Sequence, residues 1–223
     1  MNVNGGRFIT FEGGEGSGKS TQVRRLVDRL RVQGLEVVET REPGGSPGAE
    51  AIRQVLLSGA AKALGPEAEA MLFAAARSDH VENLIHPALE RGAWVVCDRF
   101  HDSTRVYQGV LGSVNPMVIN ALERITVGDV KPDLTIVLDV PVETGLARAK
   151  ARGQAPDRFE AEDPEYHSWL RIAYRKLAEN EPDRCVIIDA SANPDTVAVK
   201  IWMVVAERLL RPQRVAQTTG VAG

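Results

Sequence analysis

Five short apolar runs predict a series of β-strands. They cover residues 7–12 (RFITFE), 35–40 (LEVVET), 94–98 (WVVCD), 134–139 (LTIVLD) and 185–189 (CVIID). The last three are nearly continuous in apolar residues and rich in valine and isoleucine, a pattern typical of strands buried on both faces. Several runs end in an acidic residue, so we expect carboxylates to gather at one edge of the sheet.

Helical patterns fill the intervals between these runs. The first follows the first run and stops near Gly34, and Ser46 before Pro47 predicts the start of the next. Residues 67–90 form one long helix or two, because Pro87 must bend or end it. Further helices are predicted at 116–126, 142–152, 164–179 and 194–209. Strands alternating with helices indicate right-handed crossovers, and therefore an α/β fold in three layers with a parallel sheet between helices.

The composition allows a full core and argues against some classes of protein. The 223 residues are 43 % hydrophobic, and 27 Lys plus Arg stand against 30 Asp plus Glu, a net charge of −3. A general nucleic-acid or membrane-surface binder normally carries a basic excess, so neither partner is expected. The two cysteines, Cys97 and Cys185, are expected to be buried free thiols. With no signal peptide or membrane span apparent, we expect a cytoplasmic protein.

No internal repeat and no long linker divides the chain. We therefore expect one domain over residues 1–223, with a frayed tail at 211–223.

The segment GGEGSGKS at residues 13–20 carries the most specific chemistry, because it fits G-x-x-x-x-G-K-[ST] between a strand and an amphipathic helix. Glycines let successive backbone N–H groups point inward, and the helix N-terminus adds partial positive charge. Lys19 is then expected to reach the β- and γ-phosphates of ATP, and the Ser20 hydroxyl to ligate Mg²⁺. A glycine-rich turn that matches by chance is the alternative. The predicted ATP-binding residues are Gly13, Gly14, Glu15, Gly16, Ser17, Gly18, Lys19, Ser20 and Thr21.

Asp98 and Arg99 close the third apolar run, at the sheet edge where ligands of parallel sheets bind. Asp98 could hold Mg²⁺ directly or through water, and Arg99 could clamp an acceptor phosphate with its planar guanidinium. A structural ion pair at a strand end is the alternative. GTPases need an N-K-x-D segment, which is absent, so a nucleotide or metabolite kinase is the better interpretation of this small chain.

Two further segments are weaker signals for an acceptor site. Residues 40–45 (TREPGG) place Arg41 and Glu42 at the same sheet edge, although an ordinary turn explains them equally well. Phe73 and Arg77 share a helix face, where they could stack on a base and bond its edge. The pattern alone favours a core phenylalanine and a solvated arginine.

The basic segment 148–160 predicts a lid. Arg152 and Arg158 flank an interruption rich in glycine and proline, the composition of a flap that closes over a ligand. An arginine delivered by such a lid can stabilise charge on the transferring phosphoryl group, by on the order of 10³-fold in rate. A solvated helix face is the alternative.

Six segments stand together in the order found in thymidylate kinases: FEGGEGSGKST, TREPGG, LFAAAR, DRF-x-x-ST-x-x-YQG, PDLTIVLD and RAKARG…DRFE. The sequence resembles the bacterial members of that family over residues 7–209. The resemblance implies a P-loop NTPase fold with a five-stranded parallel sheet in the order 2-3-1-4-5, and a homodimer. It also implies transfer of the γ-phosphate of MgATP to dTMP, which yields dTDP and ADP for dTTP biosynthesis.

The resemblance also implies roles for single residues. Glu15 would orient the acceptor through its 3′-hydroxyl and a metal-bound water, and Arg99 would clamp the acceptor phosphate. Phe73 would stack on thymine, Arg77 would bond the base edge, and Tyr107 would crowd the sugar 2′ position and disfavour ribose. The predicted acceptor-binding residues are Arg41, Glu42, Phe73, Arg77, Arg99, Ser103, Thr104, Tyr107 and Gln108. Residues 190–194 would border the adenine.

Some family members carry a catalytic arginine inside the P-loop, where this chain has Gly14, so the arginine is expected from the lid. The predicted catalytic residues are Glu15, Lys19, Arg99, Arg152 and Arg158, and the predicted metal ligands are Ser20, Asp98 and Glu15. The peptide bond before Pro43 is expected to be cis. Two other functions stay open: a kinase for another deoxynucleotide or deoxynucleoside, and a non-catalytic ATP-binding switch.

Overall fold

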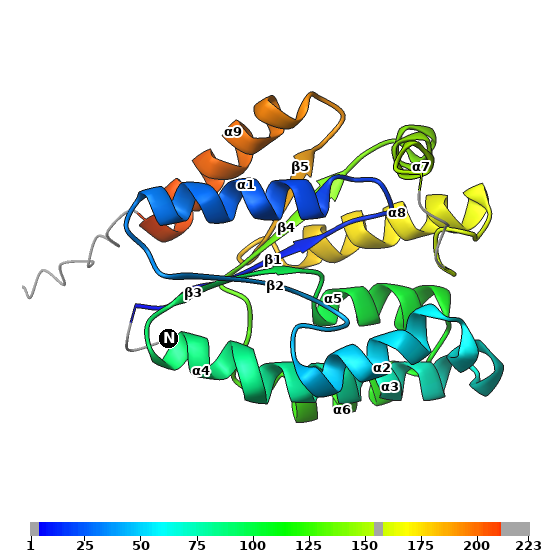
Figure 1. Ribbon diagram of the computed structural model, residues 1–223. Helices are drawn as coiled ribbons and strands as arrows, with labels where there is room; N and C mark the ends of the chain where they lie inside the picture. The colour runs from blue at the N-terminus through cyan, green and yellow to red at the C-terminus, as the bar shows by residue number, and fades with distance from the viewer. Residues whose placement is uncertain (1–4, 154–157, 211–223) are drawn as a thin grey trace, which may run out of the picture.

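Five parallel strands form the centre of the computed structural model, which describes residues 5–153 and 158–210. The strands are β1 (Phe8–Glu12), β2 (Val37–Arg41), β3 (Trp94–Asp98), β4 (Leu134–Asp139) and β5 (Cys185–Asp189). They lie in the order β2-β3-β1-β4-β5, which confirms the predicted topology (Figure 1). The predicted tail at 211–223 and the middle of the predicted lid, 154–157, lie outside the described residues.

The helices follow the predicted intervals to within a few residues. They are α1 (Lys19–Val32), α2 (Pro47–Leu57), α3 (Pro66–His80), α4 (His86–Glu90), α5 (His101–Thr104), α6 (Pro116–Thr126), α7 (Val142–Ala151), α8 (Pro164–Asn180) and α9 (Pro194–Val205). A 3-10 turn spans Ala60–Leu64, and π-helical turns span Val81–Ile85, Arg105–Leu111 and Ala206–Leu210. The first π-helical turn joins α3 to α4, where Pro87 occupies the first turn. The predicted 67–90 segment is therefore one helical run, in which a π-helical turn joins the two α-helices.

Several helices begin at a short polar residue followed by proline. Asn115, Asp163 and Asn193 each accept a hydrogen bond on the side chain from a backbone N–H of the first turn of α6, α8 and α9. Proline then fits the first helical position, because its fixed φ suits a helix and its missing N–H is not needed there.

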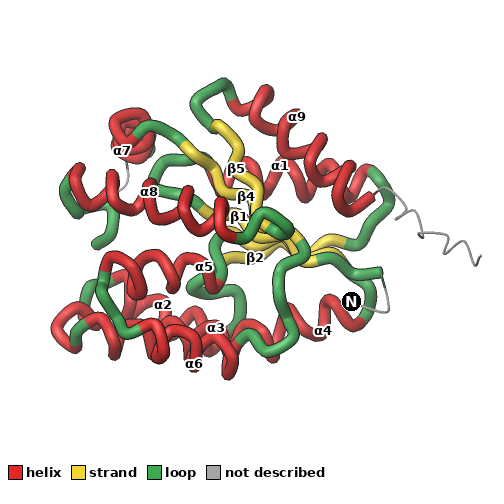
Figure 2. The backbone as a smooth tube through the Cα atoms, turned by 180° about the vertical axis from the view of Figure 1, so that it is seen from behind, coloured by secondary structure: helices red, strands yellow, loops and turns green. Residues whose placement is uncertain are grey.

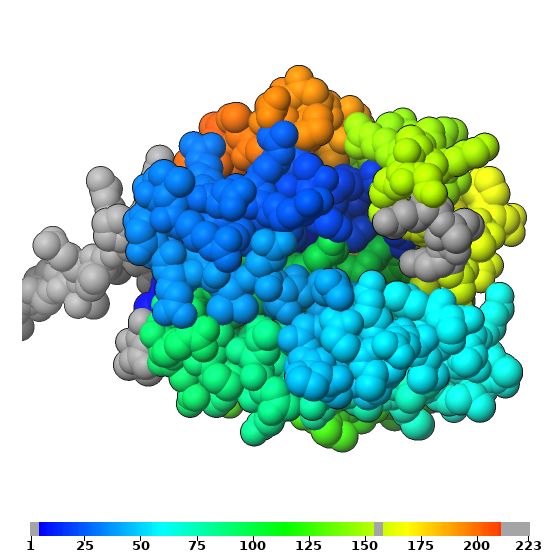
Figure 3. All heavy atoms as spheres, viewed as in Figure 1, coloured from blue at the N-terminus to red at the C-terminus, as the bar shows by residue number. Residues whose placement is uncertain are grey.

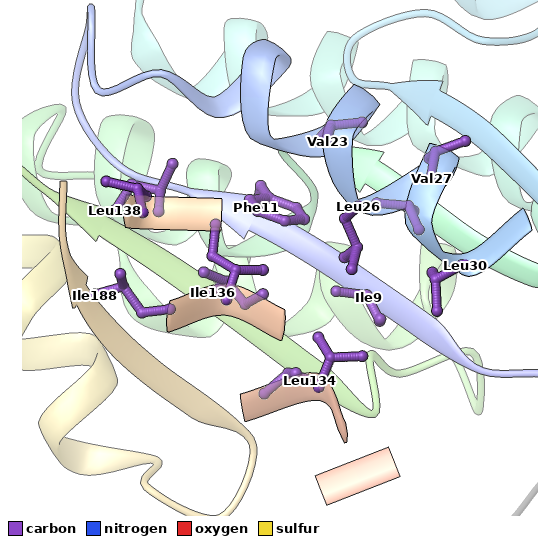
Figure 4. Close-up of a cluster of buried hydrophobic side chains, with 14 of the residues drawn as sticks. Ile9, Phe11, Val23, Leu26, Val27, Leu30, Leu134, Ile136, Leu138 and Ile188 are labelled. Carbon is purple, nitrogen blue, oxygen red and sulfur yellow. The ribbon is translucent and has the colours of Figure 1, made fainter. Parts of the chain in front are cut away.

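Helices cover both faces of the sheet (Figures 1 and 2). Side chains alternate along a strand, so Ile9 and Phe11 of β1 pack with α1 and α9 on one face, whereas Phe8 packs on the opposite face. Figure 4 shows the first of these cores, where Leu26 and Leu30 of α1 lie over residues of β1 and β4. The tightly packed sheet fixes the positions of the strand ends, where the predicted site residues lie.

Four other observations bear on the sequence predictions. Both cysteines are buried and free, and the peptide bond between Glu42 and Pro43 is cis, as expected. Within the described ranges, none of the helices has the length and apolar character needed to cross a membrane. The helical stretch at 101–111 was not predicted, because four residues of α5 and a π-helical turn are too short for a clear apolar period.

Candidate functional site

A cavity of about 550 Å³ lies at the carboxyl ends of the strands. In Figure 3 the surface is hollowed between α1 and the pair α2 and α3, with green-coloured chain at the floor. One side of the cavity is lined by residues 15–22, and the other by residues that follow β2 and β3 together with α3. Ligands of doubly wound parallel sheets bind at this edge, so the cavity is the candidate site.

The loop between β1 and α1 is held in shape by close backbone approaches. Gly13 and Gly16 have φ of 134° and 65°, where residues with a side chain are strained. A Cβ at Gly16 would also collide with the carbonyl oxygen of Gly145 in α7. Lys19 is buried, and its Nζ donates to the carbonyl oxygens of Gly13 at 3.1 Å and Gly14 at 2.9 Å. The loop therefore has the compact curl that a phosphate cradle requires.

Ser20 and Asp98 face one another beside this loop. The Ser20 hydroxyl donates to Oδ2 of Asp98 at 2.6 Å. Across residues 5–153 and 158–210, no three His, Cys, Asp or Glu side chains gather into a metal-binding group. This pair of oxygen ligands fits Mg²⁺, which usually binds one or two protein oxygens and completes its shell with phosphate and water.

Arg99 is the residue in which the two sides of the cavity meet. Its φ is 70°, unusual for a residue with a side chain, and it sends its guanidinium back toward the loop. One nitrogen donates to Oε1 of Glu15 at 2.6 Å, and the other lies within 3.3 Å of the Gly13 carbonyl, the Ser103 hydroxyl and the Tyr174 hydroxyl. These contacts hold the Arg99 guanidinium in one position, as a phosphate clamp requires.

Glu15 remains ionised in this site. Burial alone would raise its pKa, but the positive charges of Arg99 and Lys19 outweigh burial and lower the pKa to about 2. The Tyr107 hydroxyl also donates to Oε1 of Glu15 at 2.8 Å. The carboxylate therefore joins the phosphate loop to the opposite side of the cavity as a fixed negative charge.

Glu12, the last residue of β1, shares two hydrogen-bond partners with Arg99, the hydroxyls of Ser103 and Tyr174. Its fully buried carboxylate accepts from the backbone N–H of Phe100 at 2.8 Å, the Ser103 hydroxyl at 2.7 Å and the Tyr174 hydroxyl at 2.9 Å. Burial, reinforced by the nearby Asp102 carboxylate, raises the pKa of Glu12 to about 7. The hydrogen bond to Phe100 holds the turn that follows Arg99 and begins α5.

Arg77 on α3 is held by a second buried carboxylate. Its Nε donates to Oε2 of Glu42 at 2.8 Å, and its terminal nitrogen donates to Oγ1 of Thr104 at 3.0 Å. The other oxygen of Glu42 lies 3.1 Å from Nδ1 of His80, which is also buried. Arg77 is therefore buried and directed, not solvated, and it lines the cavity.

The opposite end of the cavity lies between α7 and the β5–α9 loop. Arg148 of α7 donates to the carbonyl oxygens of Ala190 at 2.9 Å and Ser191 at 3.2 Å. Ala190 and Pro194 line the cavity. This end combines apolar walls with a planar cation, which suits an adenine ring.

The two predicted lid arginines lie in different surroundings. Arg152 lines the cavity and bonds to Glu160. Arg158 is paired with Glu69 of α3 through two nitrogen–oxygen contacts of 2.5 and 2.8 Å, and it is not among the residues that line the cavity.

Comparison with known proteins places this geometry in a family. The sequence model of the thymidylate kinase family matches residues 11–201. The chain belongs to this family. The family predicted from the motifs is thereby confirmed, as is the enzyme class, an ATP-dependent nucleoside monophosphate kinase.

Curated relatives and a solved structure agree with the thymidylate kinase assignment. The thymidylate kinase of Bradyrhizobium diazoefficiens is 62 % identical over 207 residues, which cover 92 % of this chain and 91 % of the relative. That of Nitrobacter winogradskyi is 63 % identical over 207 residues, or 92 % and 90 % of the two chains. The crystal structure of the thymidylate kinase from Ehrlichia chaffeensis superposes with a TM-score of 0.73 at 32 % identity, covering 90 % of this chain and 99 % of that one.

The structure brings most of the predicted site residues of this thymidylate kinase family member to the one cavity. Those that line it are Glu15, Gly16, Ser17, Gly18, Lys19, Ser20, Thr21, Arg41, Glu42, Phe73, Arg77, Asp98, Arg99, Ser103, Thr104, Tyr107, Gln108 and Arg152. The predicted residues that do not line it are Gly13, Gly14 and Arg158.

Sequence reasoning missed the residues that support the site from behind. Glu12 could have been found, because it is an acidic residue at the end of the strand that enters the phosphate loop. His80, Glu69 and Tyr174 carry no such signal. Glu69 and His80 lie in the first and last turns of α3, where an acidic and a basic residue are ordinary, and Tyr174 lies on the buried face of α8.

Proposed function

We propose that this chain transfers the γ-phosphoryl group of MgATP to dTMP, which yields dTDP and ADP. The observation that carries the proposal is the ion pair of Arg99 with Glu15, which is 2.6 Å long. It joins the phosphate loop to the side of the cavity formed by α3 and by the residues that follow β2 and β3, which we call the acceptor side. An acceptor phosphate clamped by Arg99 would face a γ-phosphate held by Lys19. Both groups are anions, and their repulsion must be cancelled before they can approach.

The charged residues of the cavity perform that cancellation. Lys19 and Arg99 come from opposite sides, and we propose that Arg152 adds a third positive charge at the transferring group. Ser20 and Asp98 would hold Mg²⁺, which supplies charge neutralisation at the phosphate oxygens. An ionised phosphate oxygen is already nucleophilic near neutral pH, so no strong general base is needed.

The acceptor base and sugar would be recognised by the side that follows β2 and β3. We propose that Phe73 stacks on thymine and that Arg77, directed by Glu42, bonds the base edge. Tyr107 would exclude a 2′-hydroxyl, because its ring lines the cavity and its hydroxyl is bound to Glu15. A planar arginine with fixed donors prefers a carbonyl acceptor, which thymine presents and cytosine replaces with an amino group.

We also propose that the chain is a single domain that works as a homodimer in the cytoplasm. Helices α3 and α6 pack together (Figure 1) and expose Met71, Met117 and Ile125, whose exposed fractions are 54 %, 74 % and 77 %. Large apolar side chains on adjacent helices suit contact with a second copy. The two free thiols suit a reducing compartment. Sedimentation velocity tests the dimer, and a monomer at micromolar concentration would contradict it.

The decisive experiment measures ADP release from MgATP with and without dTMP. We expect release to depend on dTMP, and to be at least tenfold slower with dCMP or thymidine as acceptor. Faster turnover of thymidine than of dTMP would indicate a deoxynucleoside kinase. Tight ATP binding without transfer to any acceptor would indicate a nucleotide-binding switch.

A further inference from the structure

Arg158 forms a buried ion pair that lies behind the cavity wall. Its two terminal nitrogens meet the two oxygens of Glu69, at 2.5 and 2.8 Å. The exposed fractions of the two side chains are 17 % and 5 %. A paired, buried guanidinium of this kind is a structural anchor, because taking it from its partner would leave a charge unpaired in the interior.

Glu69 connects three parts of the chain. It lies on α3, one helical turn before the cavity residue Phe73. Its Oε2 also accepts a hydrogen bond from Nε2 of Gln108 at 3.2 Å, and Gln108 lines the cavity on the stretch after α5. Through Arg158 the same carboxylate holds the chain that leads into α8.

Phe159, the residue after Arg158, lines the cavity together with Phe73 and Tyr107, and we call these three rings the acceptor wall. The ring of Phe159 lies 5.1 Å from that of Tyr107 and 6.3 Å from that of Phe73, measured between centroids. The Arg158 guanidinium also covers the Phe159 ring at 4.4 Å, so the position of one side chain constrains the other.

We propose that Glu69 is a positioning residue for the acceptor site, whose ion pair with Arg158 holds Phe159 in the acceptor wall. The same pair keeps Arg158 engaged behind that wall, which leaves Arg152 to face the transferring phosphate. The inference rests on the proposed function, and it assigns the two arginines different tasks.

An exposed ion pair supplies a matched control. Lys62 and Glu162 lie 3.3 Å apart and join the turn before α3 to the chain before α8, as Glu69 and Arg158 join α3 to that chain. Their side chains are 67 % and 32 % exposed, and neither lines the cavity. Exposed pairs contribute little, so Glu162→Gln should leave the kinetics unchanged.

The test compares Glu69→Gln, Arg158→Met and the double variant. We expect each single change to raise KM for dTMP about tenfold and to leave KM for ATP within about twofold. The double variant should be no worse than the poorer single variant, because both changes remove one interaction. Arg152→Lys should instead lower kcat with little change in KM for dTMP.

The opposite pattern would overturn the inference. If Arg158 acted on the phosphates, Arg158→Met would lower kcat on the order of 100-fold, Glu69→Gln would not, and the two effects would multiply. If a lone buried charge prevents Glu69→Gln or Arg158→Met from folding, Phe159→Leu replaces them in the test. This variant loosens the acceptor wall and leaves the ion pair of Glu69 with Arg158 intact. An unchanged KM for dTMP in Phe159→Leu would also count against the proposal.

Calorimetric dTMP binding separates this inference from the proposed function. Unchanged dTMP affinity in Glu69→Gln, Arg158→Met and Phe159→Leu overturns the inference, whatever the turnover. A wild-type protein that binds dTMP but releases no ADP overturns the proposed function, while weaker dTMP binding by the three variants would still support the positioning role.

Discussion

The phosphate loop faces the cavity mainly with backbone, whereas the acceptor side faces it mainly with long side chains. The loop presents Gly16, Ser17 and Gly18, which have little or no side chain, and its shape comes from backbone approaches such as that of Gly16 to α7. The acceptor side presents long side chains such as Arg77, which is held by a buried carboxylate.

This difference separates the tasks of the two sides. The phosphate loop binds the same triphosphate group in every turnover, so it needs no selectivity among phosphate chains. Backbone amides at a helix N-terminus, which bind any phosphate chain, are sufficient for this. The acceptor must be distinguished from other nucleotides, and selectivity comes from directed polar side chains that are left unpaired by the wrong ligand. On the acceptor side, side chains are therefore held in position by ion pairs such as Arg77 with Glu42 and Arg158 with Glu69.

Lys19→Ala gives the largest expected effect and tests the loop alone. Removal of its charge should lower dTMP-dependent ADP release on the order of 10³-fold, because in the proposed function Lys19 supplies the loop's positive charge at the γ-phosphate. Since backbone geometry shapes the loop, the melting temperature should change by only about 2–4 °C. Initial rates and thermal melts check both. A variant that keeps more than about a tenth of the rate would contradict the role of Lys19.

Arg77→Ala tests the acceptor side and should change binding and stability together. We expect KM for dTMP to rise about 10–100-fold with KM for ATP nearly unchanged. The loss should also lower the free energy of unfolding by about 3 kcal/mol, because the buried Glu42 carboxylate loses the positive charge paired with its Oε2 and keeps only the His80 contact at its Oε1.

A double variant separates these two consequences of Arg77→Ala. Adding Glu42→Gln removes the lone charge, so it should restore part of the stability without restoring dTMP binding. Equal loss of ATP and dTMP binding in Arg77→Ala would instead indicate general structural damage.

The same contrast explains how much could be predicted from the sequence. The phosphate loop could be predicted, because the glycines that permit its shape lie within eight consecutive residues, and the strands could be predicted from their continuous apolar runs. The pair of Glu69 and Arg158 could not, since the residues lie 89 positions apart and nothing local marks either one's partner. Helix α5 could not either, because it is short and its first N–H groups are bonded by Glu12 of a distant strand.

Tyr107→Ala sharpens the account of sugar recognition with a smaller effect. Removing the ring should raise kcat/KM for the ribonucleotide relative to the deoxyribonucleotide about tenfold, since space opens beside the sugar. Tyr107→Phe is the matched control: it removes the hydroxyl bond to Glu15 and keeps the ring, so discrimination should persist. Acceptor competition assays with dTMP and its ribose analogue measure the ratio. Equal discrimination in all three proteins would remove Tyr107 from this role.

Glu12→Gln tests the support beneath Arg99 through the pH dependence of stability. The pKa of Glu12 is raised from 4.5 to about 7 by burial and by Asp102, so between these pH values the folded chain keeps a proton that the unfolded chain has lost. The free energy of unfolding of the wild type therefore falls as pH rises through this window, and glutamine cannot titrate.

The expected result is that Glu12→Gln gains stability relative to wild type, on the order of 1–3 kcal/mol, between pH values of about 4.5 and 7. Urea denaturation of both proteins across this range measures the difference. Glu15 does not interfere, because its pKa is lowered to about 2 and its contribution is lost only as pH falls from 4.5 toward that value. If the free energies of unfolding of the two proteins change with pH in parallel, Glu12 is ionised over the whole range. Its carboxylate would then be a permanent negative charge near Arg99.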